Sequence, residues 1–403
     1  QKFSDWWNGT APFFGAQFIW TALHNFGGTD GLKGDLRKVN AMPFAALEAG
    51  GNVWGTGFTG EGIDQNPAFY DFLLEQHWRS GPVPDVPGAL AARALRRYAS
   101  TGGDGAGLAA AAEAWVLLGA SMYADDVSVQ DLTGVAHLPP RSGAQDFGAD
   151  RRTPSREMCL TFQAWSKLVG AAPALDAARE PFRYDLVNLG RDVLARLSTP
   201  MALNFSDALG RAPLDAKALA ATGAPYLELL GDLDELVGTD PAFLLGSWLG
   251  MARRFGGNSS DCFAPGMPEV RTCEQFYEWN ARVQITTWNP TRAGDAKIPG
   301  GPIDYAAKHW NGLIGTYYKE RAARLLSLAL ARGAAGQPLE QAARDKAEAA
   351  LAYEWSVDFG TRHAEQPVGD AVEVSRRMLQ KYSPFFGGGC SSSAEAEGVL
   401  ALV

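Results

Sequence analysis

A glutamate in a glycine-rich segment is the residue of this sequence best placed for chemistry. Glu61 lies within residues 55–63, GTGFTGEGI, which follow a short apolar run and precede a helix expected to begin near Asn66. Glycines on both sides would allow positive φ values and let a ligand approach the loop backbone closely. The acid would then lie at the carboxyl end of a strand, where barrel enzymes hold their catalytic groups. The alternative is that Glu61 caps the following helix, a common role for an acid near a helix start.

The histidines and cysteines of the sequence do not indicate a second candidate site. The five histidines are isolated from one another and from pairs of cysteines, so we predict no metal site. Four cysteines are too few for a disulfide framework. Cys262 and Cys273, however, flank a short stretch with proline and glycine that one bridge could close. We therefore expect a local disulfide between these two residues.

Three sequons, at Asn8, Asn204 and Asn258, would carry glycans in a protein of the secretory pathway, although a chain of this size can contain three by chance. The sequence opens at Gln1 without a start methionine or the basic and apolar regions of a signal peptide. We therefore expect any targeting segment to lie upstream. No apolar run reaches the length of about 18 residues that a membrane span requires.

The composition predicts two domains. The 403-residue chain is 46% hydrophobic, which is ample for buried cores. Its formal net charge is -9, and its lysines and arginines are scattered among acids, so we exclude nucleic acid as a partner. An oligomer remains open, because apolar helix faces look alike whether they pack within a domain or against another subunit.

The first 80 residues alternate between strands and helices. Apolar and β-branched runs predict strands at 17–23 and 52–58, and helical periodicity predicts helices at 36–49 and 67–78. This alternation indicates parallel strands covered by helices. Because two strands can neither close a barrel nor bury a parallel sheet on both faces, the segment must belong to something larger.

The rest of the chain is predicted to be all-α. A proline-rich connector at 81–88 ends the alternation, and helical periodicity follows it. We therefore assign residues 1–81 to an α/β domain, residues 82–386 to an all-α domain and residues 387–403 to a disordered tail. Residues 125–154 are polar and aperiodic and should form a long surface loop. The helices expected are 108–123, 159–169, 184–197, 216–237, 243–255, 272–288, 305–331, 339–359 and 371–382.

Short motifs spread over residues 13–385 resemble the family 89 glycoside hydrolases, the α-N-acetylglucosaminidases. They fall in the family's order along the chain, and this order is far more specific than any one motif. The motifs are FIW at 18–20, LHNFGG at 23–28, GTG at 55–57, EGI at 61–63, PFRYDL at 181–186, FLLGSWL at 243–249, Trp288 and DYA at 304–306.

The resemblance implies the last β-α units of a (β/α)₈-type catalytic barrel, followed by a large helical domain that helps to wall the active site. Enzymes of this family remove terminal α-linked N-acetylglucosamine with retention, using one carboxylate as nucleophile and a second as acid/base. Glu61 is similar to the nucleophile by motif position, whereas the acid/base belongs to an earlier strand, upstream of Gln1. Because retention needs two carboxyls about 5 to 5.5 Å apart, we expect this polypeptide alone to be inactive or nearly so.

Four further residues are candidates for contact with the sugar. His24 and Asn25 follow the first strand, at the same strand mouth as Glu61, and could hydrogen-bond sugar hydroxyls or the acid itself. A pair that only stabilises the loop is the alternative. Trp288 and Tyr305 flank a Pro/Gly-rich loop from which their rings could pack against a sugar face, although packing between domains also explains them.

The expected partner is a glycan that ends in N-acetylglucosamine, of the heparan sulfate type in animal relatives, and no cofactor is expected. The resemblance also implies the secretory pathway, with the lysosome or vacuole as destination. Two other functions remain open. One is a carbohydrate-binding or scaffold protein that kept the fold and lost catalysis, and the other is a helical interaction module in which the first 80 residues are a remnant.

Overall fold

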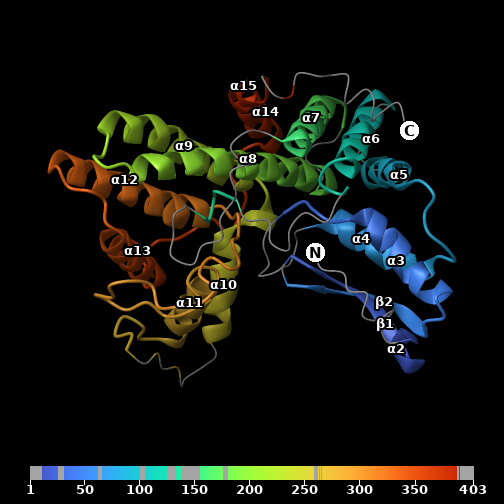
Figure 1. Cartoon of the computed structure of the whole chain (residues 1–403), viewed down its shortest axis with the longest axis horizontal. Helices are drawn as coiled ribbons and strands as arrows, with labels where there is room; N and C mark the ends of the chain where they lie inside the picture. Colours follow the sequence, from blue (N-terminus) through green and yellow to red (C-terminus); the bar gives the residue numbers. More distant parts are fainter. Residues whose placement is uncertain are drawn as a thin grey trace. The chain divides into compact units, whose positions relative to one another are not determined.

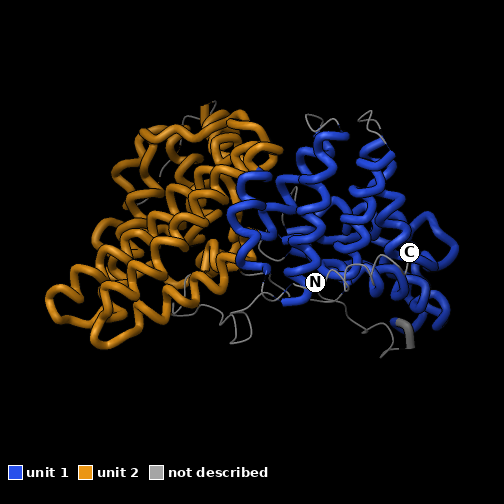
Figure 2. Tube along the Cα trace, turned by 90° about the horizontal axis from the view of Figure 1, so that it is seen from above, with its two compact units in different colours: residues 1–131, 154–193, 375–403 blue, residues 132–153, 194–374 orange. Residues whose placement is uncertain are grey.

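The computed structural model describes residues 11–25, 31–61, 66–99, 105–124, 133–137, 155–175, 180–257, 262, 264, 266–387 and 390. The chain forms two compact units, which Figure 2 shows in different colours. Unit 1 comprises residues 1–131, 154–193 and 375–403, and unit 2 comprises residues 132–153 and 194–374.

Unit 1 starts with two parallel strands and their helices, drawn in blue in Figure 1. The register places Ile19 opposite Gly55 and His24 opposite Gly60, so the carboxyl ends of the two strands lie together. The predicted order of strand, helix, strand and helix is confirmed. The elements are α2 (Ala11–Phe14), β1 (Phe18–His24), α3 (Leu36–Glu48), β2 (Val53–Gly60), α4 (Pro67–Glu75) and the 3-10 turn η2 (Gln76–Trp78).

The β1 strand alternates between buried and exposed residues. Trp20, Ala22 and His24 are buried, whereas Ile19 and Thr21 are exposed. A period of two is typical of a strand with one covered face. The strand was predicted at 17–23, but its continuous apolar sequence does not reveal that one of its faces is exposed.

The two helices of this segment begin where capping chemistry allows. The Asp35 carboxylate caps α3 by accepting a hydrogen bond from the Lys38 backbone N–H at 2.9 Å. Pro67 lies in the first turn of α4, where its missing N–H sacrifices no helical hydrogen bond. Both helices pack against β2, and α4 buries Phe69 and Phe72.

The strand predicted at 52–58 is β2, which continues to Gly60, so the loop with positive φ values expected within the glycine-rich segment is wrong as far as residue 60. Residues 53–60 are extended and pair with β1, and neither Gly55 nor Gly57 has a left-handed φ. A Cβ at Gly55 would lie 3.2 Å from the His77 imidazole, which indicates close packing at this position rather than a turn. Trp54 on β2 is 66% exposed.

Helices complete unit 1. They are α5 (Val86–Tyr98), α6 (Gly105–Gly119), α7 (Arg156–Ala171), η5 (Ala172–Ala174), the first part of α8 (Glu180–Leu209), the last part of α14 (Ala371–Tyr382) and α15 (Pro384–Gly387). α6 packs against both α5 and α7. α5 begins inside the predicted connector because Asp85 caps it, accepting from the Gly88 N–H at 3.0 Å. α7 and α8 approach closely at Gly190, where a Cβ would lie 2.8 Å from the Trp165 indole.

Unit 2 is all-α in its described residues, as predicted. It contains the rest of α8, α9 (Ala216–Val237), η6 (Pro241–Phe243), α10 (Leu245–Gly256), α11 (Cys273–Gln284), the π-helical turn η7 (Ile314–Tyr318), α12 (Lys319–Ala334), α13 (Gln341–Ser356) and the start of α14. α9 packs on α12, and α10 packs on α11 (Figure 1). The helices expected at 272–288 and 305–331 are shorter. The segment between them includes Trp288 and Asp304 at φ 60° and 56°, which no α-helix accommodates.

A short segment within the predicted surface loop is buried instead. Residues 133–137 lie in the interior of unit 2. The Gly134 N–H donates to Thr199 Oγ1 at 3.1 Å, and the Tyr226 hydroxyl donates to the Gly134 carbonyl oxygen. The remainder of the predicted loop, 125–132 and 138–154, lies outside the described residues. Polar composition predicted exposure here, whereas hydrogen bonds from distant side chains allow burial.

The predicted domain boundary after residue 81 stays a prediction, and unit 1 continues across it. The tail expected from residue 387 includes the last residue of α15 and Cys390, which forms a disulfide with Cys159. Residues 391–403 are outside the described part of the chain. Over the described ranges, no helix combines the length and the apolar character that crossing a membrane demands.

Candidate active site

Glu61 lies directly after β2, beside the carboxyl end of β1. Its backbone N–H donates a hydrogen bond to the His24 carbonyl oxygen at 3.4 Å, next to the pairing of His24 with Gly60. The residue is exposed, and Asn66 rather than Glu61 occupies the N-cap position of α4. The remainder of the predicted motif, residues 62–65, lies outside the described residues. Glu61 is therefore at an accessible strand end, where a carboxylate can meet a ligand.

His24 is held by a buried side-chain network. The Asn66 Nδ2 atom lies 3.0 Å from His24 Nε2 and 2.6 Å from the Lys33 carbonyl oxygen. The Tyr123 hydroxyl donates to Asn66 Oδ1 at 2.7 Å. Because the Lys33 carbonyl only accepts, the Asn66 amide must direct its NH₂ group to that side. His24 Nε2 is then an acceptor, and we assign the proton of the neutral imidazole to Nδ1.

Burial keeps the His24 imidazole neutral. Its side chain has no exposed area and stacks on Phe69 with ring centroids 4.1 Å apart. Desolvation lowers the pKa of His24 well below its ordinary value, and the positive charge of Lys33 lowers it further. Asn25 is also buried and has a φ of 53°, a conformation that asparagine tolerates better than most residues. These contacts favour a role in stabilising the strand end, and direct sugar contacts of both residues stay predictions.

Trp288 and Tyr305 form a ring pair in unit 2. Their centroids are 6.1 Å apart with an interplanar angle of 65°, an edge-to-face arrangement. The Asp304 backbone N–H donates to the Thr286 carbonyl oxygen at 2.7 Å and so joins the two ends of the loop that carries them. Trp288 is 42% exposed and Tyr305 is half-buried. The pair therefore presents an aromatic surface on a loop with fixed ends.

A buried arginine connects this loop to a segment that sequence reasoning missed. Arg321 pairs with Asp304 at 2.7 Å and also donates to the carbonyl oxygen of Ala136. Burial opposes the charged form of Arg321, but attraction to Asp304 raises its pKa above the ordinary value. Arg321 therefore binds Ala136, which precedes His137, and Asp304, which precedes Tyr305. His137 is buried and becomes a further candidate, although the aperiodic sequence around it gave no signal.

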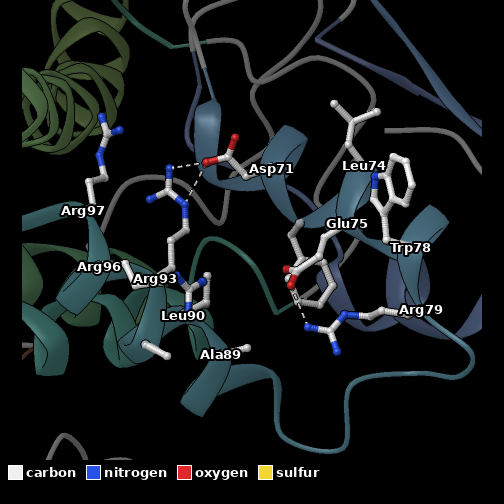
Figure 3. Close-up of a pocket in the computed structure, with 12 residues that line it drawn as sticks. Asp71, Leu74, Glu75, Trp78, Arg79, Ala89, Leu90, Arg93, Arg96 and Arg97 are labelled. Carbon is white, nitrogen blue, oxygen red and sulfur yellow. Dashed lines mark hydrogen bonds and ion pairs between the residues drawn. The ribbon is translucent and has the colours of Figure 1, made fainter.

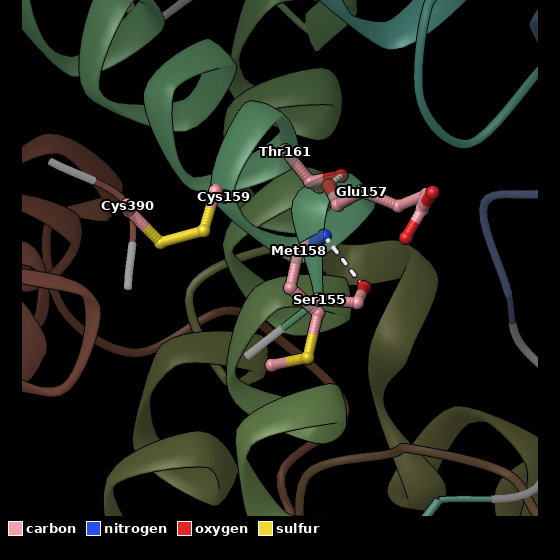
Figure 4. Close-up of a disulfide and its surroundings, with 6 residues drawn as sticks. All are labelled: Ser155, Glu157, Met158, Cys159, Thr161 and Cys390. Atoms are coloured by element: carbon pink, nitrogen blue, oxygen red, sulfur yellow. Dashed lines mark hydrogen bonds between the residues drawn. A yellow bond between two sulfur atoms is a disulfide. The ribbon is translucent and has the colours of Figure 1, made fainter. Parts of the chain in front are cut away.

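Two disulfides are present among the described cysteines. One joins Cys262 to Cys273, the pair expected from the sequence, and the other joins Cys159 on α7 to Cys390 (Figure 4). Spacing could not indicate the second bridge, because its cysteines are 231 residues apart. In the described ranges, no three His, Cys, Asp or Glu side chains gather where they could hold a metal ion.

The three sequons differ in what the structure shows of them. Asn204 is exposed on α8, where a glycan could be accommodated. Asn8 and Asn258 lie outside the described residues. Occupancy of all three stays a prediction.

Two family models match the chain. The alpha-N-acetylglucosaminidase (NAGLU) tim-barrel domain matches residues 1–80, and the alpha-N-acetylglucosaminidase (NAGLU) C-terminal domain matches residues 93–381. The chain belongs to the alpha-N-acetylglucosaminidase family. This membership confirms the resemblance drawn from short motifs, together with the predicted fold class of a partial barrel followed by a large helical domain.

Known alpha-N-acetylglucosaminidases and family 89 structures resemble most of the chain. The human alpha-N-acetylglucosaminidase is 35% identical over 388 residues, which cover 93% of this chain and 46% of the human protein. The chain therefore spans about half the length of that curated relative. A family 89 glycoside hydrolase from Clostridium perfringens, in complex with 2-acetamido-1,2-dideoxynojirmycin, has a TM-score of 0.74 at 21% identity, covering 93% of this chain and 40% of its own. A variant of the Clostridium perfringens enzyme in complex with its substrate GlcNAc-alpha-1,4-galactose has the same TM-score, identity and coverage. These structures share the fold of this family member.

Proposed function

We propose that this chain supplies the nucleophile of an exo-acting, retaining α-N-acetylglucosaminidase. The observation that carries the proposal is the position of Glu61 at the carboxyl end of β2, in a member of this family. Its carboxylate would attack the anomeric carbon of a terminal α-linked N-acetylglucosamine and form a covalent glycosyl-enzyme intermediate. Water would then hydrolyse this intermediate, which restores the anomeric configuration of the substrate.

A second carboxyl is required for the leaving group. It protonates the departing oxygen in the first step and takes a proton from water in the second. The family resemblance assigns this role to no residue of this chain. General acid catalysis contributes about 10² to 10⁴-fold to such rates, so we expect the chain alone to have little or no activity.

Trp288 and Tyr305 are the residues that we propose to contact the sugar. Aromatic rings present flat apolar faces that suit the C–H face of a pyranose. The exposure of Trp288, its pairing with Tyr305 and the closed ends of their loop support this role. His24 and Asn25 would act chiefly by fixing the strand end that precedes Glu61 in space.

We also propose a protein of the secretory pathway, with the lysosome or vacuole as destination. The two disulfides support an oxidising compartment, and the exposed Asn204 sequon is compatible with a glycoprotein. The substrate would be a glycan ending in α-linked N-acetylglucosamine, of the glycosaminoglycan type in animals. Treatment of the purified natural protein with an N-glycan-removing amidase should increase its electrophoretic mobility, and an unchanged mobility would count against glycosylation.

The decisive experiment replaces the nucleophile in the longest natural polypeptide that contains this chain. Glu61→Gln keeps the size of the side chain but removes the nucleophilic charge, so kcat on an aryl α-N-acetylglucosaminide should fall by at least about 10³-fold. Proton NMR of the wild-type reaction should show that the first product is the α-anomer. Thermal unfolding of the variant should match that of the wild type.

Glu48→Gln is the matched control, because Glu48 is an exposed carboxylate at the end of α3. It should leave kcat unchanged. Retention of more than a tenth of the activity by Glu61→Gln would refute the nucleophile assignment. A wild-type protein that binds a 2-acetamido iminosugar but turns over no substrate would instead support the carbohydrate-binding alternative.

A further inference from the structure

A pocket of about 730 Å³ lies within unit 1, between α4 with η2 on one side and α5 on the other (Figure 3). Its volume falls in the range of roughly 300 to 1,000 Å³ that is usual for small-ligand sites. Its lining comes from α4, η2 and α5, and neither Glu61 nor any of the proposed sugar contacts is part of it. The lining of this pocket is therefore separate from the proposed catalytic and sugar-binding residues.

The lining is cationic within an acidic chain. Four arginines and two carboxylates contribute, in a chain whose formal charge is -9. One of the four, Arg97, is paired at 2.5 Å with Asp185, which is not part of the lining, so one arginine of the pocket remains in excess. Arg93 contacts Asp71 through Nε at 3.0 Å and Nη2 at 2.7 Å, and Arg79 pairs with Glu75 at 2.7 Å. Figure 3 shows these two pairs at separate places around the pocket.

One guanidinium of the pocket is available to a ligand. Arg96 is exposed and forms no ion pair with any residue in the part of the chain that the structure describes. The pair between Arg79 and Glu75 is itself accessible, with side chains 35% and 44% exposed. Exposed pairs of this kind contribute only about 0 to 1 kcal/mol, so an incoming anion can compete for Arg79 as well. Guanidinium groups bind carboxylate and sulfate oxygens in a forked geometry.

The acids and the aromatic residue narrow the class of ligand. Asp71 and Glu75 can only accept hydrogen bonds, whereas the arginines can only donate them. A ligand that complements both carries hydrogen-bond donors, such as hydroxyl groups, as well as an anionic group. Trp78 is 86% exposed at the edge of the pocket, so a face of its ring is accessible to a ligand. A pyranose with an acidic substituent has all three features: hydroxyl donors, an anionic group and a flat apolar face.

We propose that this pocket binds an acidic saccharide. The anionic group lies between Arg96 and Arg79, hydroxyl groups donate to Asp71 and Glu75, and the sugar ring packs on Trp78. The anionic group is a uronic carboxylate or a sulfate ester, which share this chemistry. The site goes beyond the proposed glycosidase function and does not depend on it, because no step of bond cleavage is involved.

Titration calorimetry on the longest natural polypeptide that contains this chain tests the proposal. Four probes are compared, none of which carries a terminal α-linked N-acetylglucosamine: a disaccharide with one carboxylate, the same disaccharide with one sulfate ester instead, the neutral disaccharide and inorganic sulfate. At least one acidic disaccharide should bind about tenfold or more tightly than the neutral one and than inorganic sulfate. The tighter acidic form identifies the anionic group. Its affinity should weaken as salt rises from about 0.05 to 0.5 M, because screening reduces the attraction.

Two variants locate the binding. Arg96→Gln and Trp78→Ala should each weaken binding of the acidic disaccharide about tenfold, and both residues are exposed, so circular dichroism should remain unchanged. The matched controls are Arg254→Gln, whose side chain is 67% exposed in unit 2, and Trp54→Ala, which is 66% exposed on β2. Both controls should bind like the wild type. Equal affinity for neutral and acidic disaccharides, equal affinity for inorganic sulfate, or equal losses in variants and controls would overturn the proposal.

Discussion

The Glu61 backbone N–H donates a hydrogen bond to the His24 carbonyl oxygen. The backbone of the proposed nucleophile is thereby bonded to His24, the last residue of β1. The His24 imidazole is buried, stacks on Phe69 and is hydrogen-bonded to Asn66. The position of this exposed carboxylate thus depends on contacts inside the protein. Preorganisation of this kind is what a retaining mechanism demands of its nucleophile.

The Asn66 network is predicted to be a main support of this strand end. Asn66→Leu removes three hydrogen bonds and leaves the Tyr123 hydroxyl and the Lys33 carbonyl without this partner. Unsatisfied buried groups cost about 1 to 3 kcal/mol each, so the free energy of unfolding should fall by about 2 to 5 kcal/mol. Urea denaturation followed by circular dichroism measures this loss. Tyr123→Phe removes only one of the bonds and should cost about 1 kcal/mol; if both variants lose the same amount, the network does not have the importance assigned to Asn66.

The buried neutral histidine predicts a loss of stability in acid. His24 in the unfolded chain titrates near about 6.5, whereas its pKa in the folded protein is well below this value. Below about pH 6.5 the unfolded state therefore binds more protons than the folded state. As the pH is lowered through this range, His24 reduces the free energy of unfolding by up to about 1.4 kcal/mol per pH unit. Above that pH both states are neutral and the contribution is constant. Burial also lowers the pKa of His363, to about 4, so its effect has the same sign between about pH 6.5 and 4.

His24→Gln tests this assignment, because glutamine can still accept the hydrogen bond from Asn66 but cannot titrate. Unfolding free energies measured between about pH 5 and 8 should show a shallower decline for the variant below about pH 6.5. The two proteins should show parallel curves above about pH 7. Identical slopes in acid would mean that His24 is not a neutral group in the folded protein.

The order of elements in the first segment could be predicted because each has a clear period and capping signal. Pro67 in the first turn and Asp35 at the cap mark helix starts in the sequence itself. The strand predicted at 52–58 also agrees closely with β2, but its continuation through Thr59 and Gly60 was not predicted, because glycine favours turns and pairing with β1 overrides that preference. The end of β2 depends on pairing with β1, which is distant in sequence.

The side-chain networks could not be predicted from the sequence either, because their members are distant in sequence. Arg183 and Asp185 are close in sequence, but residues two apart on a helix face different directions. Asp185 instead binds Arg97 and Tyr98, at 2.5 and 2.7 Å, which lie on another helix. Motif order made Glu61 the candidate nucleophile, and that role stays a prediction. A shared motif can indicate the position of a residue in the sequence, but not the contacts around it.

The Cys159–Cys390 disulfide is predicted to stabilise the fold more than Cys262–Cys273. The two bridges close loops that differ greatly in length, with sequence separations of 231 and 11. If a bridge acts mainly by restricting the unfolded chain, these lengths correspond to about 5 and 3 kcal/mol. Each pair is replaced by two serines, and the free energy of unfolding of each variant is measured by urea denaturation. The variant that lacks Cys159 and Cys390 should lose more of this free energy than the variant that lacks Cys262 and Cys273. The reverse order would show that restriction of the unfolded chain is not the dominant effect.

The Asp185 carboxylate should be among the most costly acids to remove from unit 1. It is buried and accepts hydrogen bonds from both Arg97 and the Tyr98 hydroxyl. Asp185→Leu leaves a partly buried guanidinium without its counter-charge, and loss of one partner of such a pair costs about 3 to 5 kcal/mol. Asp71→Leu is the control, because Asp71 also binds an arginine through two hydrogen bonds but its side chain is 62% exposed. That change should cost about 1 kcal/mol or less. Guanidinium chloride denaturation of the two variants separates the outcomes, and comparable losses would show that burial does not set the strength of these pairs.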